Sequence, residues 1–312
     1  MNSAEIKTVA LVKDKDQHYL SYEKELKKHH INLDLIDIWS KPEQDRLLSN
    51  HYDAFIWRAK HNPQIKNLAR RYIYLFDQVV KVPTYPGWRS YWHYDDKISQ
   101  YYLFQTHQIP TIPTYIFFRR EEAMEFVEHA DYPLIYKCPH GAGSSNVGLL
   151  KSRHQARRYV NKIFGRGVRT YFKSEIQRGY VYLQDFLPGN EGDYRIYCFS
   201  NVLAFGIFRR NRKDDPFASG SDLIEYIDIP EQILDVAMNA NQKMEFDIMS
   251  YDLLLNRDNQ WVISEISCIF RDRKIKYNYY LKQDNHWQKR QMQDSISEMA
   301  ISHILKNVWK WI

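Results

Sequence analysis

The segment from residue 132 to residue 150 constrains the fold most, because it places a glycine- and serine-rich loop between two short apolar runs. The first run ends in Lys137, and the second begins at Val147. Glycine adopts positive φ angles without steric cost, so such a loop can turn consecutive backbone N–H groups toward an anion. The lysine would add a point charge. The pattern predicts two strands around a phosphate-binding loop, although an ordinary glycine-containing hairpin turn explains the segment equally well.

Strand-like and helix-like segments alternate over the first ninety residues. Apolar periodicity predicts strands at 6–12, 33–39 and 54–57, and helices at 19–29, from about 42, and at 63–79. This alternation predicts a parallel sheet with helices on its faces. Ligands of such sheets bind beyond the carboxyl ends of the strands, which makes Arg58 and Lys60 candidates for a substrate pocket. A structural surface arginine is the alternative for Arg58.

Two acidic side chains in the last quarter of the chain form a second pattern. The polar residues 257–260 predict a hairpin loop, and counting back from it places Asp252 opposite Glu265. Opposed residues share a sheet face with Cβ atoms roughly 5 Å apart, so the two charges repel and an alanine at either position should keep or raise stability. A bridging Mg²⁺ would remove the repulsion, with Ser267 as a third oxygen ligand. The alternative is a solvent-facing sheet edge with two hydrated acids.

The rest of the second half mixes strands and helices. Strand-like runs lie at 180–186, 194–199 and 202–210, and a helix is expected near 230–243. An apolar stripe in residues 286–312 predicts a long C-terminal helix packed on the core.

Charge and composition limit the kinds of partner. The net charge of +6 and the pI near 8.9 favour an anionic ligand such as a nucleotide, a phosphate or a carboxylate. The chain shows no nucleic-acid-binding motif and no apolar run of roughly eighteen residues, so neither nucleic acid nor membrane is an expected partner. The N-terminus lacks a secretion signal, and three distant cysteines (Cys138, Cys198 and Cys268) fit a reducing compartment, so we expect a cytoplasmic protein.

The order and spacing of these motifs resemble the ATP-grasp superfamily, in particular carboxylate–amine ligases of the glutathione-synthetase and ribosomal-protein glutamate-ligase type. The resemblance covers almost the whole chain and implies an α/β fold, α+β in its ATP-binding part. An N-terminal parallel Rossmann-like domain would span residues 1–90. Two α+β subdomains would then clamp ATP: a central one at 91–186 with the phosphate-covering loop, and a C-terminal one at 187–312 with the magnesium hairpin.

The resemblance also assigns roles to individual residues. The implied ATP-binding residues are the two phosphate lysines, the covering loop, the adenine hinge and the ribose acid: Lys97, Lys137, Gly143, Ser144, Ser145, Gln184, Asp185, Leu187 and Asp193. The implied metal ligands are Asp252, Glu265 and Ser267, and the implied catalytic residues are Arg195 and Arg210.

Two positions depart from the pattern of the superfamily, and one position leaves a choice. The third metal position is normally asparagine, and Ser267 is a shorter and weaker ligand. The substrate-closing loop at 217–221 carries Ala218 where related enzymes often have arginine, so substrate recognition there must differ. Arg209 and Arg210 alternate across a strand, so one of them faces the site, and the resemblance selects Arg210.

The implied reaction is ATP-dependent carboxylate–amine ligation, in which an acyl phosphate forms and an amide results, with release of ADP and phosphate. ATP and Mg²⁺ are the implied cofactors, and a small-molecule carboxylate and amine are the implied partners, with a homodimer left open. Two alternatives remain at this point. One is an ATP-grasp kinase that phosphorylates a hydroxyl, and the other is an ATP-binding module without turnover, which the weakened position at Ser267 keeps open.

Overall fold

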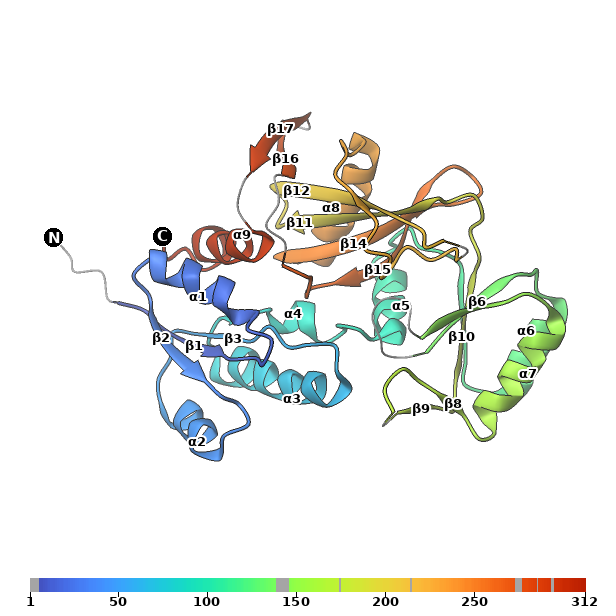
Figure 1. The fold of residues 1–312 in the computed structure, drawn as a ribbon, viewed down its shortest axis with the longest axis horizontal. Helices are drawn as coiled ribbons and strands as arrows, with labels where there is room; N and C mark the ends of the chain where they lie inside the picture. The colour runs from blue at the N-terminus through green and yellow to red at the C-terminus, as the bar shows by residue number, and fades with distance from the viewer. Residues whose placement is uncertain are drawn as a thin grey trace.

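The computed structural model of the chain describes residues 6–138, 146–173, 175–213, 215–272, 277–284, 286–292 and 295–312. Three sheets form the centres of three lobes, and a short hairpin of β8 (Val168–Arg169) and β9 (Ile176–Gln177) lies beside the second lobe (Figure 1). Parallel and antiparallel sheets are both present, and helices pack against them, so the predicted α/β class is confirmed.

The first lobe is a parallel sheet with strand order β2-β1-β3-β4. Its strands are β1 (Thr8–Val12), β2 (Asn32–Ile36), β3 (Ala54–Ile56) and β4 (Thr84–Tyr85); its helices are α1 (Tyr19–Lys28), α2 (Lys41–Ser49) and α3 (Pro63–Tyr74), with a π-helical turn at Leu75–Val80. Helix α3 begins after Asn62, whose side-chain oxygen accepts hydrogen bonds from the backbone N–H groups of Gln64 and Ile65. The segment between β3 and this cap therefore lies at the carboxyl edge of the sheet, as expected for a parallel sheet.

The second lobe is an antiparallel sheet with strand order β5-β10-β6-β7. Its elements are β5 (Thr114–Phe117), α6 (Arg120–His129), β6 (Leu134–Lys137), β7 (Val147–Leu150), α7 (Arg153–Phe164) and β10 (Val181–Asp185). Helices α6 and α7 cover one face of the sheet through a small core that includes Val127, Val160 and Leu183 (Figure 1). Lys137 pairs with Val147 across β6 and β7, which confirms the two strands predicted around the glycine-rich loop.

The third lobe is a seven-stranded antiparallel sheet with order β15-β14-β11-β12-β16-β17, and β13 pairs with β12. Its strands are β11 (Gly192–Phe199), β12 (Leu203–Arg210), β13 (Ile224–Glu225), β14 (Ile248–Leu255), β15 (Trp261–Ser267), β16 (Tyr277–Gln283) and β17 (His286–Met292). Helix α8 (Glu231–Met244) packs against this sheet through residues such as Leu234, Met238 and Met244. Helices α4 (Trp88–Tyr91) and α5 (Lys97–Thr106) connect the first lobe to the second.

The predicted long helix over residues 286–312 is wrong in its first part. Residues 286–292 form β17, which pairs with β16 as a hairpin, and Trp287 Nε1 donates a hydrogen bond to Asp235 of α8. Helix α9 starts only at Ile296 (Ile296–His303) and continues as a π-helical turn, Ile304–Val308. It returns to the first lobe and lies beside α1, where Ile301 and Leu26 belong to one core (Figure 1).

The three lobes do not follow one another simply along the chain, because α9 of the last segment completes the core of the first lobe. The domain boundaries expected at residues 90 and 186 remain predictions. Within the described ranges, no helix has both the length and the apolar character needed to cross a membrane.

A buried ion pair connects the first lobe to the start of α5. Lys66 of α3 is 0 % exposed, and its Nζ donates to the backbone oxygen of Asp95 at 2.8 Å and to its Oδ2 at 3.1 Å. Burial lowers the pKa of Lys66, and the Asp95 carboxylate opposes that shift. Next to this pair, Asp96 Oδ1 accepts from the Ser99 N–H and caps α5, so the ion pair fixes where α5 begins.

We predict that Lys66→Met destabilises the protein by about 3 kcal/mol, because removing one partner leaves a poorly compensated carboxylate in the interior. Urea unfolding followed by circular dichroism measures this effect. The control is Lys41→Met in the exposed Lys41–Asp45 pair, where a change within about 0.5 kcal/mol is expected. Equal effects of the two substitutions would show that the buried pair adds no particular stability.

Candidate active site

A cavity of about 570 Å³ is bordered by all three lobes. Most of the residues singled out in the sequence line it. Those residues are Lys97, Lys137, Gln184, Asp185, Leu187, Asp193, Arg195, Asp252, Glu265 and Ser267, together with Arg58, Lys60 and the loop 217–221. Gly143, Ser144 and Ser145 lie outside the described residues. The structure thus brings together side chains that are up to 209 positions apart, from Arg58 to Ser267.

Two buried lysines lie on one side of this cavity. Lys137 is the last residue of β6 and is 9 % exposed, and burial lowers its pKa to about 8. Lys97 is the first residue of α5, and its Nζ lies 3.9 Å from Asp95 Oδ1 and 4.0 Å from Glu265 Oε1. Gln100, one turn further along α5, donates to the Ile266 carbonyl oxygen at 2.9 Å. The helix that carries Lys97 is therefore held against strand β15.

The predicted adenine hinge follows β10 and is fixed by its neighbours. Gln184 Nε2 donates to Thr114 Oγ1 at 2.9 Å, and the Asp185 N–H donates to the Pro113 carbonyl oxygen at 3.0 Å. Asn190 donates from its side chain to the Leu187 and Leu255 carbonyl oxygens, at 3.3 and 3.0 Å. Asn190 anchors the chain after the hinge to the end of β14, and no motif in the sequence points to it.

Four charged side chains form a continuous network on the cavity face of the large sheet. Arg195 binds Asp252 through two parallel bonds of 2.6 and 2.7 Å, and Arg209 binds Asp193 through two bonds of 2.6 Å. Arg209 Nη2 also lies 2.7 Å from Asp252 Oδ2, which joins the two pairs. Burial opposes the charge on Asp252, yet the two guanidinium groups hold the pKa of Asp252 well below its usual range.

The choice of Arg210 over Arg209 is wrong for this structure. Arg209 is 7 % exposed and lines the cavity, whereas Arg210 is exposed on the other face and pairs with Glu225 and Glu191. The cause is the register of the β11–β12 hairpin, in which Arg209 lies opposite Asp193 and Arg210 lies opposite Gly192. Counting back from the turn at residues 200–202 would have identified this pairing.

The carboxylate pair predicted from the last hairpin is in register. Asp252 lies opposite Glu265, but the loop is one residue longer than expected, because Leu255 faces Trp261. A β-bulge compensates: Leu253 faces Ile263, which leaves Ser264 as the extra residue. Ser264 Oγ donates to the Asp252 carbonyl oxygen at 3.1 Å, so the bulge is tied to the acidic residue that it aligns. The pairing prediction was therefore correct although the predicted loop was not.

Ser267 is engaged in a local turn. Its Oγ donates to the Ile269 carbonyl oxygen at 2.5 Å and accepts from the Ile269 N–H at 3.3 Å. Two carboxylates side by side are the hard oxygen donors that Mg²⁺ prefers, so Asp252 and Glu265 fit this ion. The role of Ser267 as a third ligand remains a prediction.

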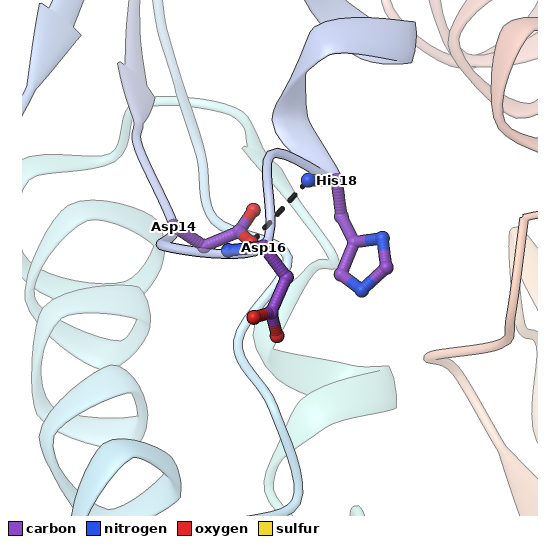
Figure 2. Close-up of side chains that lie close together, drawn as sticks. All are labelled: Asp14, Asp16 and His18. Carbon is purple, nitrogen blue, oxygen red and sulfur yellow. Dashed lines mark hydrogen bonds between the residues drawn. The ribbon is translucent and has the colours of Figure 1, made fainter.

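The group Asp14, Asp16 and His18 near the cavity has a structural explanation (Figure 2). Asp14 Oδ1 accepts from the backbone N–H groups of Asp16 and His18, and its Oδ2 accepts from that of Tyr19, so Asp14 organises the turn into α1. Asp16 pairs with Lys60. The Asp14 carboxylate is therefore used within the loop and the Asp16 carboxylate in the pair with Lys60, and the group is not assigned a metal.

Comparison with known proteins adds to this geometry. Residues 94–280 match the family of RimK-like ATP-grasp domains. The chain is 21% identical over 225 residues to an α-aminoadipate–LysW ligase, LysX, of Saccharolobus solfataricus. The aligned residues cover 72% of this chain and 77% of that protein.

Two solved structures share the fold. D-cycloserine synthetase DcsG superposes with a TM-score of 0.60 at 15% identity, covering 85% of this chain and 92% of that chain. The ATP-grasp ligase PsnB, complexed with the precursor peptide PsnA2 and AMPPNP, gives a TM-score of 0.55 at 15% identity, covering 87% and 91%.

We predict that the two carboxylates differ in their effect on stability. Asp252→Ala should lower the free energy of unfolding by about 3 kcal/mol, because it leaves the buried Arg209 and the partly buried Arg195 undercompensated. This reverses the expectation from the sequence, where the pair was considered without the arginines. Glu265→Ala should change stability by about 0.5 kcal/mol or less, since its side chain is 35% exposed. Guanidinium chloride unfolding of both variants without nucleotide tests the difference, and a neutral Asp252→Ala would contradict it.

Proposed function

This chain belongs to the family of RimK-like ATP-grasp domains and is an ATP-dependent ligase, and we propose that it joins a carboxylate to an amine through an acyl phosphate. One observation carries the proposal: the cavity gathers two buried lysines, the partly buried Arg195, the buried Arg209 and a facing pair of carboxylates. A carboxylate that attacks a triphosphate brings together groups of like charge, so cations must surround the reacting centre. This cavity provides that arrangement.

The nucleotide would lie between the second and third lobes. Lys97 and Lys137 line the cavity and would contact its phosphates, and residues 184–187 would receive the adenine through backbone groups. Asp193 is the candidate for the ribose hydroxyls. Both of its oxygens already accept from Arg209, but an ionised carboxylate has about four acceptor positions, so two remain for hydroxyl donors.

Asp252 and Glu265 would hold Mg²⁺, which when bound neutralises charge on the phosphates. In the protein alone, Asp252 is held by Arg195 and Arg209. A cation that reaches Asp252 from the cavity would compete with the two arginines for the carboxylate oxygens. N–H groups of Arg195 and Arg209 would then be free to bind another anion. We therefore assign the second catalytic role, beside that of Arg195, to Arg209 and not to Arg210.

The reaction has two displacement steps. A carboxylate oxygen attacks the γ-phosphorus and ADP leaves; an amine then attacks the acyl carbon and inorganic phosphate leaves. Arg195 and Arg209 donate N–H groups to the anionic oxygens of the acyl phosphate and of the tetrahedral intermediate. No protein nucleophile is needed. We propose that the reaction takes place in the cytoplasm, where ATP is available and where the three buried free cysteines stay reduced.

We predict that nucleotide affinity depends on the charge of Lys137. Because burial lowers its pKa to about 8, Lys137 is charged below that pH and loses its proton above it, so AMPPNP affinity should fall between pH 7.5 and 9.5. Lys137→Ala should weaken binding at pH 7.5 by about 2 kcal/mol and flatten the pH profile, because one charge-assisted contact is lost. Calorimetry with Mg²⁺ present measures both. An unchanged affinity in a folded variant would remove Lys137 from the phosphate site.

We predict that oxygen passes from the carboxylate substrate to phosphate. A panel of carboxylates and amines is first screened for ADP release that requires both, and the active carboxylate is then labelled with oxygen-18. Ligation through an acyl phosphate transfers one labelled oxygen to the released phosphate, which mass spectrometry detects. Unlabelled phosphate, or a stable phosphorylated alcohol formed without an amine, would favour a kinase instead. The matched control is Arg210→Gln, which should retain turnover because its side chain is outside the cavity.

A further inference from the structure

Arg58 is a buried cation at the part of the cavity formed by the first lobe. It follows β3, lines the cavity and is 7 % exposed. Its Nη2 donates to the Phe270 carbonyl oxygen at 2.6 Å. Across the described ranges of the chain, no carboxylate lies within ion-pair distance of its guanidinium group. Arg58 was expected in a substrate pocket or on the surface, and the structure places it in the cavity.

Three acids lie in the region of Arg58, and each is engaged by another group: Asp16 and Asp222 in ion pairs, and Asp272 by hydrogen bonds from the Ser21 hydroxyl and the Ser297 N–H. Lys60 pairs with Asp16, and Arg271 Nη1 lies 3.1 Å from Asp222 Oδ1, on either side of the same region. His18 lines the same cavity, and burial together with the Arg58 guanidinium group lowers its pKa. Among the described residues, the charge of Arg58 is therefore not neutralised by an ion pair.

An uncompensated guanidinium group in the interior is unfavourable, because arginine cannot lose its proton at accessible pH. One other cavity cation is in the same condition: Lys137, the candidate for the nucleotide phosphates, for which the described residues offer no ion pair either. The cations between them are neutralised, since Arg195 and Arg209 bind Asp252 and Asp193. The cavity thus has two cations without an ion-pair partner among the described residues: Lys137 beside the proposed nucleotide site and Arg58 beside the first lobe.

We propose that Arg58 binds an oxyanion of the substrate, so that the ligated substrate carries a second anionic group, a carboxylate or a phosphate, besides its reacting group. This rests on the proposed function and specifies its substrate class. The planar guanidinium fork matches either oxyanion through two parallel bonds. Phe270, which Arg58 contacts, is five residues beyond Glu265 in the sequence, so the two sites are at most about 18 Å apart along the chain. One small molecule can span that distance.

The test compares compounds with one and two anionic groups. Protein saturated with Mg²⁺ and AMPPNP is titrated in a calorimeter with straight-chain dicarboxylates of four to six carbons, the corresponding phosphono-carboxylates, and the monocarboxylates of equal length. At one length or more, the second anion should tighten binding at least about tenfold, as expected for a charge-assisted pair of bonds. The phosphono compounds distinguish a phosphate site from a carboxylate site.

Variants then assign the preference to Arg58. Arg58→Gln keeps a donor for the Phe270 carbonyl oxygen but removes the charge, and it should abolish the preference while AMPPNP affinity stays unchanged. Arg58→Lys should retain part of it. Arg46→Gln, on the exposed surface of α2, is the control and should behave as the wild type.

Two results would overturn the inference: a wild-type protein that binds one-anion and two-anion compounds equally, or a preference that survives in Arg58→Gln. Thermal unfolding supplies a separate readout. Arg58→Met should unfold at an equal or higher temperature without ligand, because an uncompensated charge is removed; a large drop would indicate a purely structural arginine. Loss of AMPPNP binding by the wild type would defeat the proposed function, and the same titrations without nucleotide would still report on Arg58.

Discussion

The chain of ion pairs from Asp193 through Arg209 and Asp252 to Arg195 is the constraint on which the site depends. Its members come from three neighbouring strands, β12, β11 and β14, and the pairs Asp193–Arg209 and Arg195–Asp252 are each directly in register. A slip of one residue in any strand would turn that strand's charged side chain to the opposite face of the sheet. Such a slip would remove a charged group from the cavity face and leave its partner unpaired, so the network specifies the register as well as the charge of the cavity.

The other lobes are positioned around this face. Gln100 ties the helix that carries Lys97 to β15, and Asn190 ties the hinge to the end of β14. Arg58 reaches from the first lobe to the Phe270 carbonyl oxygen just beyond β15. Each contact is a hydrogen bond between a side chain and backbone of another segment, and these polar contacts add to two apolar clusters that contain residues of both the first and the third lobe.

The sequence predicts those parts of the fold that rest on local periodicity. Alternation in the first ninety residues identifies the parallel sheet, and the loop after Lys137 identifies the β6–β7 pair. Residues 286–292 were misassigned, because an apolar side chain every three or four residues fits a helix even where pairing with β16 makes a strand. Local patterns carry no information on which neighbouring strand is present.

The site was predictable in its chemistry and less so in its geometry. Counting back from the hairpin loop correctly predicts that Asp252 and Glu265 face each other. The predicted loop is one residue too short, but the bulge at Ser264 shifts the register by one residue and compensates for that error. The resemblance to related enzymes predicts a basic residue at the end of this strand, where Arg209 and Arg210 are adjacent. Only the register with Asp193 decides which of the two faces the cavity, so Arg209 was not selected. Asn190 and Gln100 act through contacts with distant backbone, for which a single sequence gives no signal.

The packing of α9 on α1 has a consequence for synthesis on the ribosome. Leu26 and Val9 share one apolar cluster with Ile301 and Leu305, so the nascent first lobe lacks part of its core until α9 and the turn after it have been translated. Until then it exposes apolar surface, which makes nascent intermediates prone to aggregation and dependent on chaperones. Of the three lobes, the one translated first is thus among the last to be completed, and the packing of α9 is a late step in its folding.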